Sequence, residues 1–143
     1  MDWLLFLSLI LVGFVGCAEF GSLVFVHPVI RKLDAEYQLV SEKGLLETFG
    51  RFMPFGMTTA TALGIALAID RASSWYIAAA ASLTVALMVT IVGNVPINSW
   101  TGRLSGKEIP EGFIAKRRKW DVFQAIRASL QLLGFLLMVA GAV

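Results

Sequence analysis

Charged residues are scarce in this sequence. Only 15% of its 143 residues are charged and the mean hydropathy is +0.77, whereas about 25% of the residues in a soluble domain are charged. The apolar residues are gathered into four runs of the length that crosses a bilayer, about 20 residues each. The sequence therefore excludes an ordinary soluble domain and predicts an all-α fold, a bundle of four transmembrane helices.

The chain is also poor in cysteine and histidine, with only Cys17 and His27. One cysteine excludes an intrachain disulfide, and one imidazole cannot form a zinc or copper site unaided. The phosphate loop and the GxSxG, CxxC and HExxH motifs of soluble enzymes are absent. The N-terminal Met-Asp-Trp lacks the basic region of a signal peptide, so the first apolar run is expected to remain as a span.

A single membrane domain is predicted over residues 1–143. Its spans are expected at about residues 3–30, 52–69, 75–95 and 120–142. The short turn at 70–74 makes spans 2 and 3 antiparallel neighbours, so an antiparallel bundle is predicted. The charged segment between spans 1 and 2 is predicted to form an amphipathic helix at the membrane interface.

Basic residues are distributed unevenly. Ten of them lie in or beside loops 31–50 and 101–119, and only Arg71 lies on the opposite side. Because Lys and Arg accumulate in cytoplasmic loops, we predict that both loops are cytoplasmic and both termini outside, in a bacterial-type inner membrane. The KRRK cluster at 116–119 is interpreted as a topology determinant touching anionic lipid, and no nucleic-acid partner is expected.

This topology brings polar residues of several spans to the cytoplasmic end. Arg127 is the most informative, because an arginine inside a span costs about 2.5–3.5 kcal/mol to insert and normally has a partner. The other deep charge is Glu19, so an ion pair is expected; the alternative is that Arg127 snorkels to the headgroups. The other members of this predicted layer are His27, Met53, Asn94, Asn98, Trp120, Gln124 and Gln131.

Asn94, Asn98 and His27 could each have a purely structural role instead of binding a ligand. Pro96 is expected to end span 3 and free backbone carbonyls, which Asn94 and Asn98 either merely cap or cap while donating to a ligand. His27 is either a satisfied interfacial residue or the axial ligand of a haem, which needs only one histidine on one side. Met53 or Met57 could then be a second ligand.

Small residues recur at one-turn spacing on spans 1 and 2. Such ridges let helices approach closely in lipid, and packing within the bundle is favoured over a homodimer seam. The ridge residues are Gly13, Cys17 and Gly21 on span 1 and Gly56, Ala60, Gly64 and Ala68 on span 2.

Several of these features together resemble the anthrone oxygenase-like family of small four-span membrane proteins. They are His27-Pro28 at the end of span 1, VPIN at 95–98 after span 3, and Trp120 with Arg127 opening span 4. The resemblance covers essentially the whole chain. Many members have a histidine where this chain has Gln124.

The resemblance implies a membrane oxidoreductase that uses dioxygen on a small apolar aromatic or quinone-like substrate near the cytoplasmic face. His27 is then the metal ligand of a b-type haem or, without haem, the base that removes the proton. Arg127 stabilises the enolate or a haem propionate, Asn94 and Asn98 orient oxygen atoms, and Trp120 and Met53 complete the cofactor site. The alternatives are a non-catalytic haem- or quinone-binding module and a structural subunit.

Overall fold

The computed structural model describes residues 2–106 and 108–143, and these residues form helices and no strand. The predicted all-α fold is therefore confirmed. Four helical stretches are long and apolar enough to cross a membrane, so the chain is a multi-pass integral membrane protein. They are Trp3–Ile30, Phe49–Arg71, Ser74–Arg103 and Phe113–Ala142.

Two of the four stretches are divided by a π-helical turn. The first consists of α1 (Trp3–Gly21), the turn η1 (Ser22–Val26) and α2 (His27–Ile30). The third consists of α5 (Ser74–Val89), the turn η2 (Thr90–Asn94) and α6 (Val95–Arg103). The other elements are α3 (Ala35–Glu47), α4 (Phe49–Arg71) and α7 (Phe113–Ala142).

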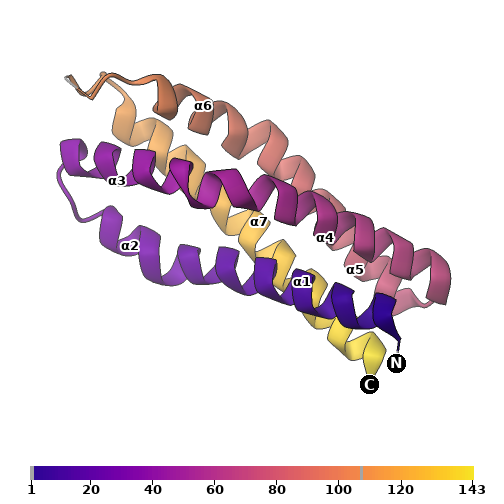
Figure 1. Ribbon diagram of the computed structural model, residues 1–143. Coiled ribbons are helices and arrows are strands. Elements are labelled where there is room, and N and C mark those ends of the chain that lie inside the picture. The colour runs from indigo at the N-terminus through magenta and orange to yellow at the C-terminus, as the bar shows by residue number, and fades with distance from the viewer. Residues whose placement is uncertain (1, 107) are drawn as a thin grey trace.

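Both chain termini lie at one end of the bundle, and α3 and α6 lie at the other, which we call the α3 end (Figure 1). Only Ala72 and Ser73 connect α4 to α5, and Ala72 has a left-handed φ of 48° that closes the turn. Its backbone N–H donates to the Ala68 carbonyl, as is usual at a left-handed helix end.

The prediction that Pro96 ends span 3 is wrong. Val95 has helical backbone angles, with φ −59° and ψ −45°, and the helix continues to Arg103. A proline inside a helix removes one hydrogen bond and clashes with the carbonyl four residues earlier. Here the wider turn η2 ends two residues before Pro96, and η1 ends two residues before Pro28. A π-helical turn absorbs such a mismatch without ending the helix.

The ends of the spans differ accordingly from those predicted. Span 3 extends past residue 95 to Arg103, and α7 begins at Phe113 rather than at residue 120. Span 2 begins at Phe49 rather than at residue 52, with Pro54 inside it.

Small residues are used inside the bundle. A Cβ atom at Gly56 would lie 3.1 Å from a Val15 methyl, and one at Gly64 would lie 2.9 Å from Leu83 Cδ1. On the first span Gly13 of the predicted ridge is tightly packed, and so is Gly16, which was not predicted. The other two ridge residues are not, because Cys17 is exposed and a Cβ atom at Gly21 would meet only Phe25, at 4.0 Å. The homodimer stays a prediction.

The predicted amphipathic helix forms as α3, but one of its faces is covered by protein. It packs against α4 and α6 and buries Gln38, Leu39 and Glu42. Thr48, with φ −106° and ψ −81°, separates α3 from α4. The chain reverses between α2 and α3, and α3 then runs on toward α4 (Figure 1). Glu42 of α3 meets His27 of α2 and Arg117 of α7.

Candidate functional site

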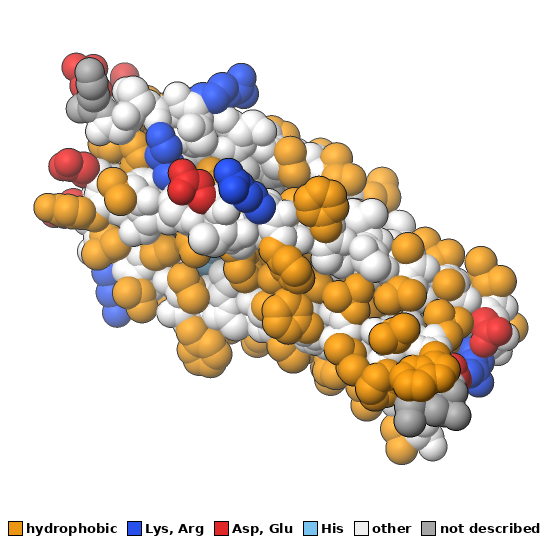
Figure 2. All heavy atoms as spheres, in the orientation of Figure 1, with side chains coloured by type: hydrophobic (Ala, Val, Ile, Leu, Met, Phe, Trp, Pro, Cys, Tyr) orange, Lys and Arg blue, Asp and Glu red, His pale blue; other side chains and the backbone are white. Residues whose placement is uncertain are grey.

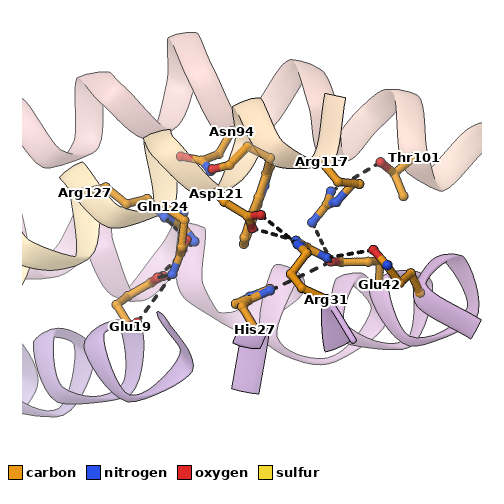
Figure 3. A network of polar contacts seen from close by, with 12 residues as sticks. Glu19, His27, Arg31, Glu42, Asn94, Thr101, Arg117, Asp121, Gln124 and Arg127 are labelled. Atoms are coloured by element: carbon orange, nitrogen blue, oxygen red, sulfur yellow. Dashed lines mark hydrogen bonds and ion pairs between the residues drawn. The ribbon is translucent and has the colours of Figure 1, made fainter. Parts of the chain in front are cut away.

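Glu19 and Arg127 form the predicted ion pair. Glu19 Oε2 lies 3.0 Å from Arg127 Nη2, with Glu19 fully buried and Arg127 6% exposed (Figure 3). Arg127 therefore does not snorkel to the membrane surface. Two opposite charges that neutralise each other inside the bundle remove most of the cost that a lone arginine incurs there.

Gln124 completes this arrangement, and we call the three residues the Glu19 cluster. Gln124 donates from Nε2 to Glu19 Oε2 at 2.9 Å and accepts from Arg127 Nε at 2.6 Å. Each member therefore contacts the other two, which fixes the guanidinium in one orientation. Arg127 also points Nη1 at the Met57 sulfur, 3.9 Å away. Gln131, on the same face of α7, is buried without a hydrogen-bond partner among the described residues.

A second cluster lies at the α3 end and has Glu42 at its centre. Glu42 accepts from Arg31 at 2.7 Å and from Arg117 at 2.5 Å. Arg31 also makes a two-pronged ion pair with Asp121, with both N–O distances 2.7 Å. These four residues, the Glu42 cluster, join α2, α3 and α7 (Figure 3).

Two charges of each sign balance in the Glu42 cluster. Burial acts to lower the pKa of Arg31, but its hydrogen bond to Asp121 and the charge of Glu42 outweigh that effect, so the pKa lies above its ordinary value. Arg31 therefore stays protonated and compensates both carboxylates. A buried pair with good geometry and additional hydrogen bonds recovers its desolvation cost.

Arg117 corrects the interpretation of the KRRK segment as a lipid-facing cluster. Its side chain is 1% exposed, pairs with Glu42 and lies over the Trp120 ring, 4.5 Å from the centroid. Lys116, Arg118 and Lys119 are exposed. One residue of the four thus belongs to the interior.

His27 lies between the two clusters. It is 5% exposed, its ring centroid is 4.6 Å from that of Trp120, and its Nδ1 lies 3.8 Å from Glu42 Oε1. That distance is too long for a hydrogen bond. Glu42 nevertheless gives the histidine a neighbouring carboxylate, which the sequence did not predict.

A pocket of about 60 Å³ opens between the clusters. Its polar wall consists of Ser22, His27, Glu42, Thr90, Asn98, Trp120, Gln124 and Arg127. Its other wall consists of Leu45, Leu46, Phe49, Gly50, Met53, Pro54 and Val95. Most of the predicted site residues therefore line one pocket, whereas Asn94, Gln131 and Met57 do not. Those that line it are His27, Met53, Asn98, Trp120, Gln124 and Arg127.

Three lining residues carry buried polar atoms without a hydrogen-bond partner in the described part of the chain. They are His27 Nδ1, Asn98 Oδ1 and Trp120 Nε1. Buried polar groups in folded proteins are almost always hydrogen-bonded. The pocket thus offers at least one N–H donor, from the indole, and one acceptor to a molecule with complementary groups.

The two asparagines have different positions, and neither caps a broken helix end. Asn94 is fully buried and donates to the Trp120 carbonyl at 3.4 Å. It lies beside the pocket and contacts the backbone that carries Trp120. Asn98 lines the pocket directly.

The predicted b-type haem fits this arrangement poorly. The pocket of about 60 Å³ is much smaller than the roughly 300–1,000 Å³ of pockets that enclose larger organic ligands. Trp120 lies against His27, and Met57 contacts Arg127 and Thr90 rather than facing the histidine.

The sequence did not predict the Glu42 cluster, because Arg31, Glu42 and Arg117 lie in segments interpreted as loops and Asp121 lies at the very start of the predicted fourth span. One signal was available on α7. The face shared by Trp120, Gln124 and Arg127 continues one turn earlier to Arg117, so that arginine could have been assigned to the interior. The sequence gives no comparable signal for Glu42, whose position depends on how α3 turns back.

The fold and the site define a small four-span helical membrane protein with a buried polar pocket at one end. The chain matches the family model "Anthrone oxygenase" over residues 45–137, well over half its length. It belongs to the anthrone oxygenase family, and the match indicates a function related to membrane oxygenases. The match includes Asn98, Trp120 and Arg127 but not His27 or Glu42. No curated protein and no solved structure was found that matches the chain.

Proposed function

We propose that the protein is a cofactor-independent oxygenase that converts an acidic methylene group of an apolar aromatic ketone, such as an anthrone, to a carbonyl with dioxygen. The observation that carries the proposal is the convergence of His27, Trp120 and Arg127 on one pocket in a member of this family. The three side chains supply a base, an N–H donor and a cation.

His27 is the proposed base. A ketone of this class loses a methylene proton to give an enolate, whose charge passes to the carbonyl oxygen. The proton goes to the His27 imidazole, and Glu42, 3.8 Å from Nδ1, stabilises the imidazolium. A positioned base of this kind contributes about 10²–10⁴-fold to a rate.

The enolate oxygen is stabilised by Arg127 and the Trp120 N–H. Arg127 is held in place by Glu19 and Gln124, so its orientation requires no rearrangement when charge develops. The Trp120 N–H has no other partner among the described residues. Preorganised donors in a buried site are worth about 10²–10³-fold each. Asn98 orients a further oxygen atom of the substrate.

The carbanion carbon then gives an electron pair to dioxygen, in one-electron steps, and a C–O bond forms. The peroxide takes the proton back from His27. Loss of the second methylene proton with cleavage of the O–O bond gives the carbonyl and one water molecule. The sum is one CH₂ group and one O₂ converted to one C=O group and one H₂O, so no external reductant is needed.

The test is oxygen uptake by the protein in liposomes with a panel of anthrones and hydroquinones. We expect one O₂ consumed per carbonyl formed with an anthrone, and loss of this activity in His27→Gln. An absorption spectrum of the same sample tests the haem prediction. A Soret band in the wild type that is lost in His27→Ala would show that the protein binds haem through His27.

The alternative is a module that binds a quinone without chemistry, and the free donor and acceptor atoms of the pocket also suit that role. Binding of a naphthoquinone by the wild-type protein, without oxygen uptake on any substrate of the panel, would favour this alternative.

A further inference from the structure

We propose that the pocket receives its substrate sideways from the bilayer, through an opening between α4 and the η2–α6 segment. We call this opening the mouth and define it by Gly50, Pro54, Val95 and Asn98. The ligand class is a flat aromatic ketone, phenol or quinone dissolved in the lipid. The inference rests on the proposed function for the identity of the ligand.

Exposure of the pocket walls changes from one side to the other. The polar floor is closed, since His27, Trp120 and Arg127 are each 6% exposed or less. On the other side Pro54 is exposed and Val95 is 42% exposed. Gly50 and Asn98, between these extremes, are half-buried. The pocket is therefore open at the mouth and closed at its inner end, where His27 lies.

Helix packing explains why the mouth exists. Among the described residues, α4 packs against α1, α3 and α5 but forms no extended interface with η2, α6 or α7. The third and fourth spans are in close contact, because η2 packs on α7 and a Cβ atom at Gly93 would meet the Phe123 ring at 2.4 Å. In the described part of the chain, the start of α4 therefore packs on α1 but forms no extended interface with the η2–α6 segment at the level of the pocket.

The side facing the α3 end is closed by charges. Glu42 lines the pocket and is paired with Arg31 and Arg117, and Arg117 also donates to Thr101 of α6 at 3.4 Å. Opening this side would separate buried ion pairs and leave uncompensated charges in the interior, which is strongly unfavourable. Widening the mouth separates only apolar and amide groups.

The mouth lies among lipid-facing side chains. Phe52, Phe55 and Val92 are 50%, 77% and 74% exposed. Figure 2 shows apolar side chains along the middle of one face of the bundle and charged ones toward its ends. Val95 is five residues from Trp100, or about 7.5 Å along the helix at roughly 1.5 Å per residue. Because tryptophan is enriched at the membrane–water interface, we assign Trp100 to the headgroup level and the mouth to the hydrocarbon just beneath it.

A second hollow, of about 180 Å³, also reaches His27. It is lined by Leu23, Pro28, Arg31 and Asp121, but not by Trp120, Gln124 or Arg127. A substrate there would meet the histidine without the groups that stabilise an enolate, so this hollow is the less suitable route.

The experiment uses a photoactivatable, diazirine-bearing naphthoquinone delivered in liposomes that contain the full-length protein. We compare Val95→Trp, which narrows the mouth, with Val85→Trp. Val85 is on the same span, is 47% exposed and lies outside the pocket. We expect the probe to label the wild type within residues 45–54 and 90–98. The rate of labelling should fall about tenfold in Val95→Trp, equivalent to roughly 1.4 kcal/mol. It should not change in Val85→Trp. Val95→Ala should label faster than the wild type.

Equal labelling of Val95→Trp and Val85→Trp, with Val95→Ala unchanged, would overturn the proposal. So would equally fast labelling by a sulfonated, membrane-impermeant form of the probe. Because labelling needs no turnover, wild-type labelling at the mouth without oxygen uptake would refute the proposed oxygenase while leaving the route intact.

Discussion

Glu19 and Arg127 are 3.0 Å apart in the interior of the bundle, and Gln124 contacts both. A single charge inside a span is costly in lipid, so a charged residue at that depth normally has a partner. The pair explains how the bundle tolerates both charges. It also holds a guanidinium at the edge of a pocket that His27 lines. The structural role of Arg127 and its proposed catalytic role can be separated by experiment.

The first prediction concerns this pair. Arg127→Leu should abolish oxygen uptake, and the double variant Glu19→Gln with Arg127→Leu should be as stable as the wild type yet remain inactive. The glutamine removes the carboxylate that would otherwise be stranded in the interior. Thermal unfolding in detergent and oxygen uptake measure the two effects. Recovery of activity in the double variant would show that Arg127 serves only to neutralise Glu19.

The second prediction separates Arg117 from its neighbour in the KRRK segment. Arg117→Gln should lower the stability of the protein, by less than the roughly 3–5 kcal/mol of a fully broken buried pair, because Arg31 still contacts Glu42. Arg118→Gln should have no measurable effect, because Arg118 is exposed. Equal melting temperatures for the two variants would contradict the assignment of Arg117 to the interior.

The third prediction tests the close packing of η2 on α7. A Cβ atom at Gly93 would lie 2.4 Å from Phe123 Cγ, whereas one at Gly44 would meet nothing within 4 Å. Gly93→Ala should therefore destabilise the protein by about 1–3 kcal/mol, the usual cost of overpacking. Gly44→Ala should stabilise α3 by up to about 1 kcal/mol. Detergent unfolding of both variants against the wild type gives the comparison.

The fourth prediction concerns orientation. In a Cys17→Ala background, Arg118→Cys should stay unlabelled by an impermeant thiol reagent in intact cells, and Ser74→Cys should react. The reason is the excess of Lys and Arg at the α3 end, which marks the cytoplasmic side. The opposite labelling pattern would invert the topology.

Much of the fold follows from the sequence because membrane spans are defined by long apolar runs. The pairing of Glu19 with Arg127 was also predictable, since these are the two charges far inside the spans. The continuation of span 3 past Pro96 was not, because the rule for proline ignores the π-helical turn that a packed bundle can accommodate. The role of Glu42 depends on how the chain returns between α2 and α3 and on the packing of α3 against its neighbours, neither of which leaves a pattern in the sequence.

The most direct measurement is hydrogen–deuterium exchange at the methylene carbon of an anthrone, followed by NMR in ²H₂O without dioxygen. It isolates proton removal from all later steps. We expect the wild-type protein to accelerate exchange, and His27→Gln to lower the accelerated rate by roughly 100-fold or more, as for loss of a general base. Exchange by His27→Gln as fast as that of the wild type would contradict the assignment of His27 as the base and, with it, the proposed site.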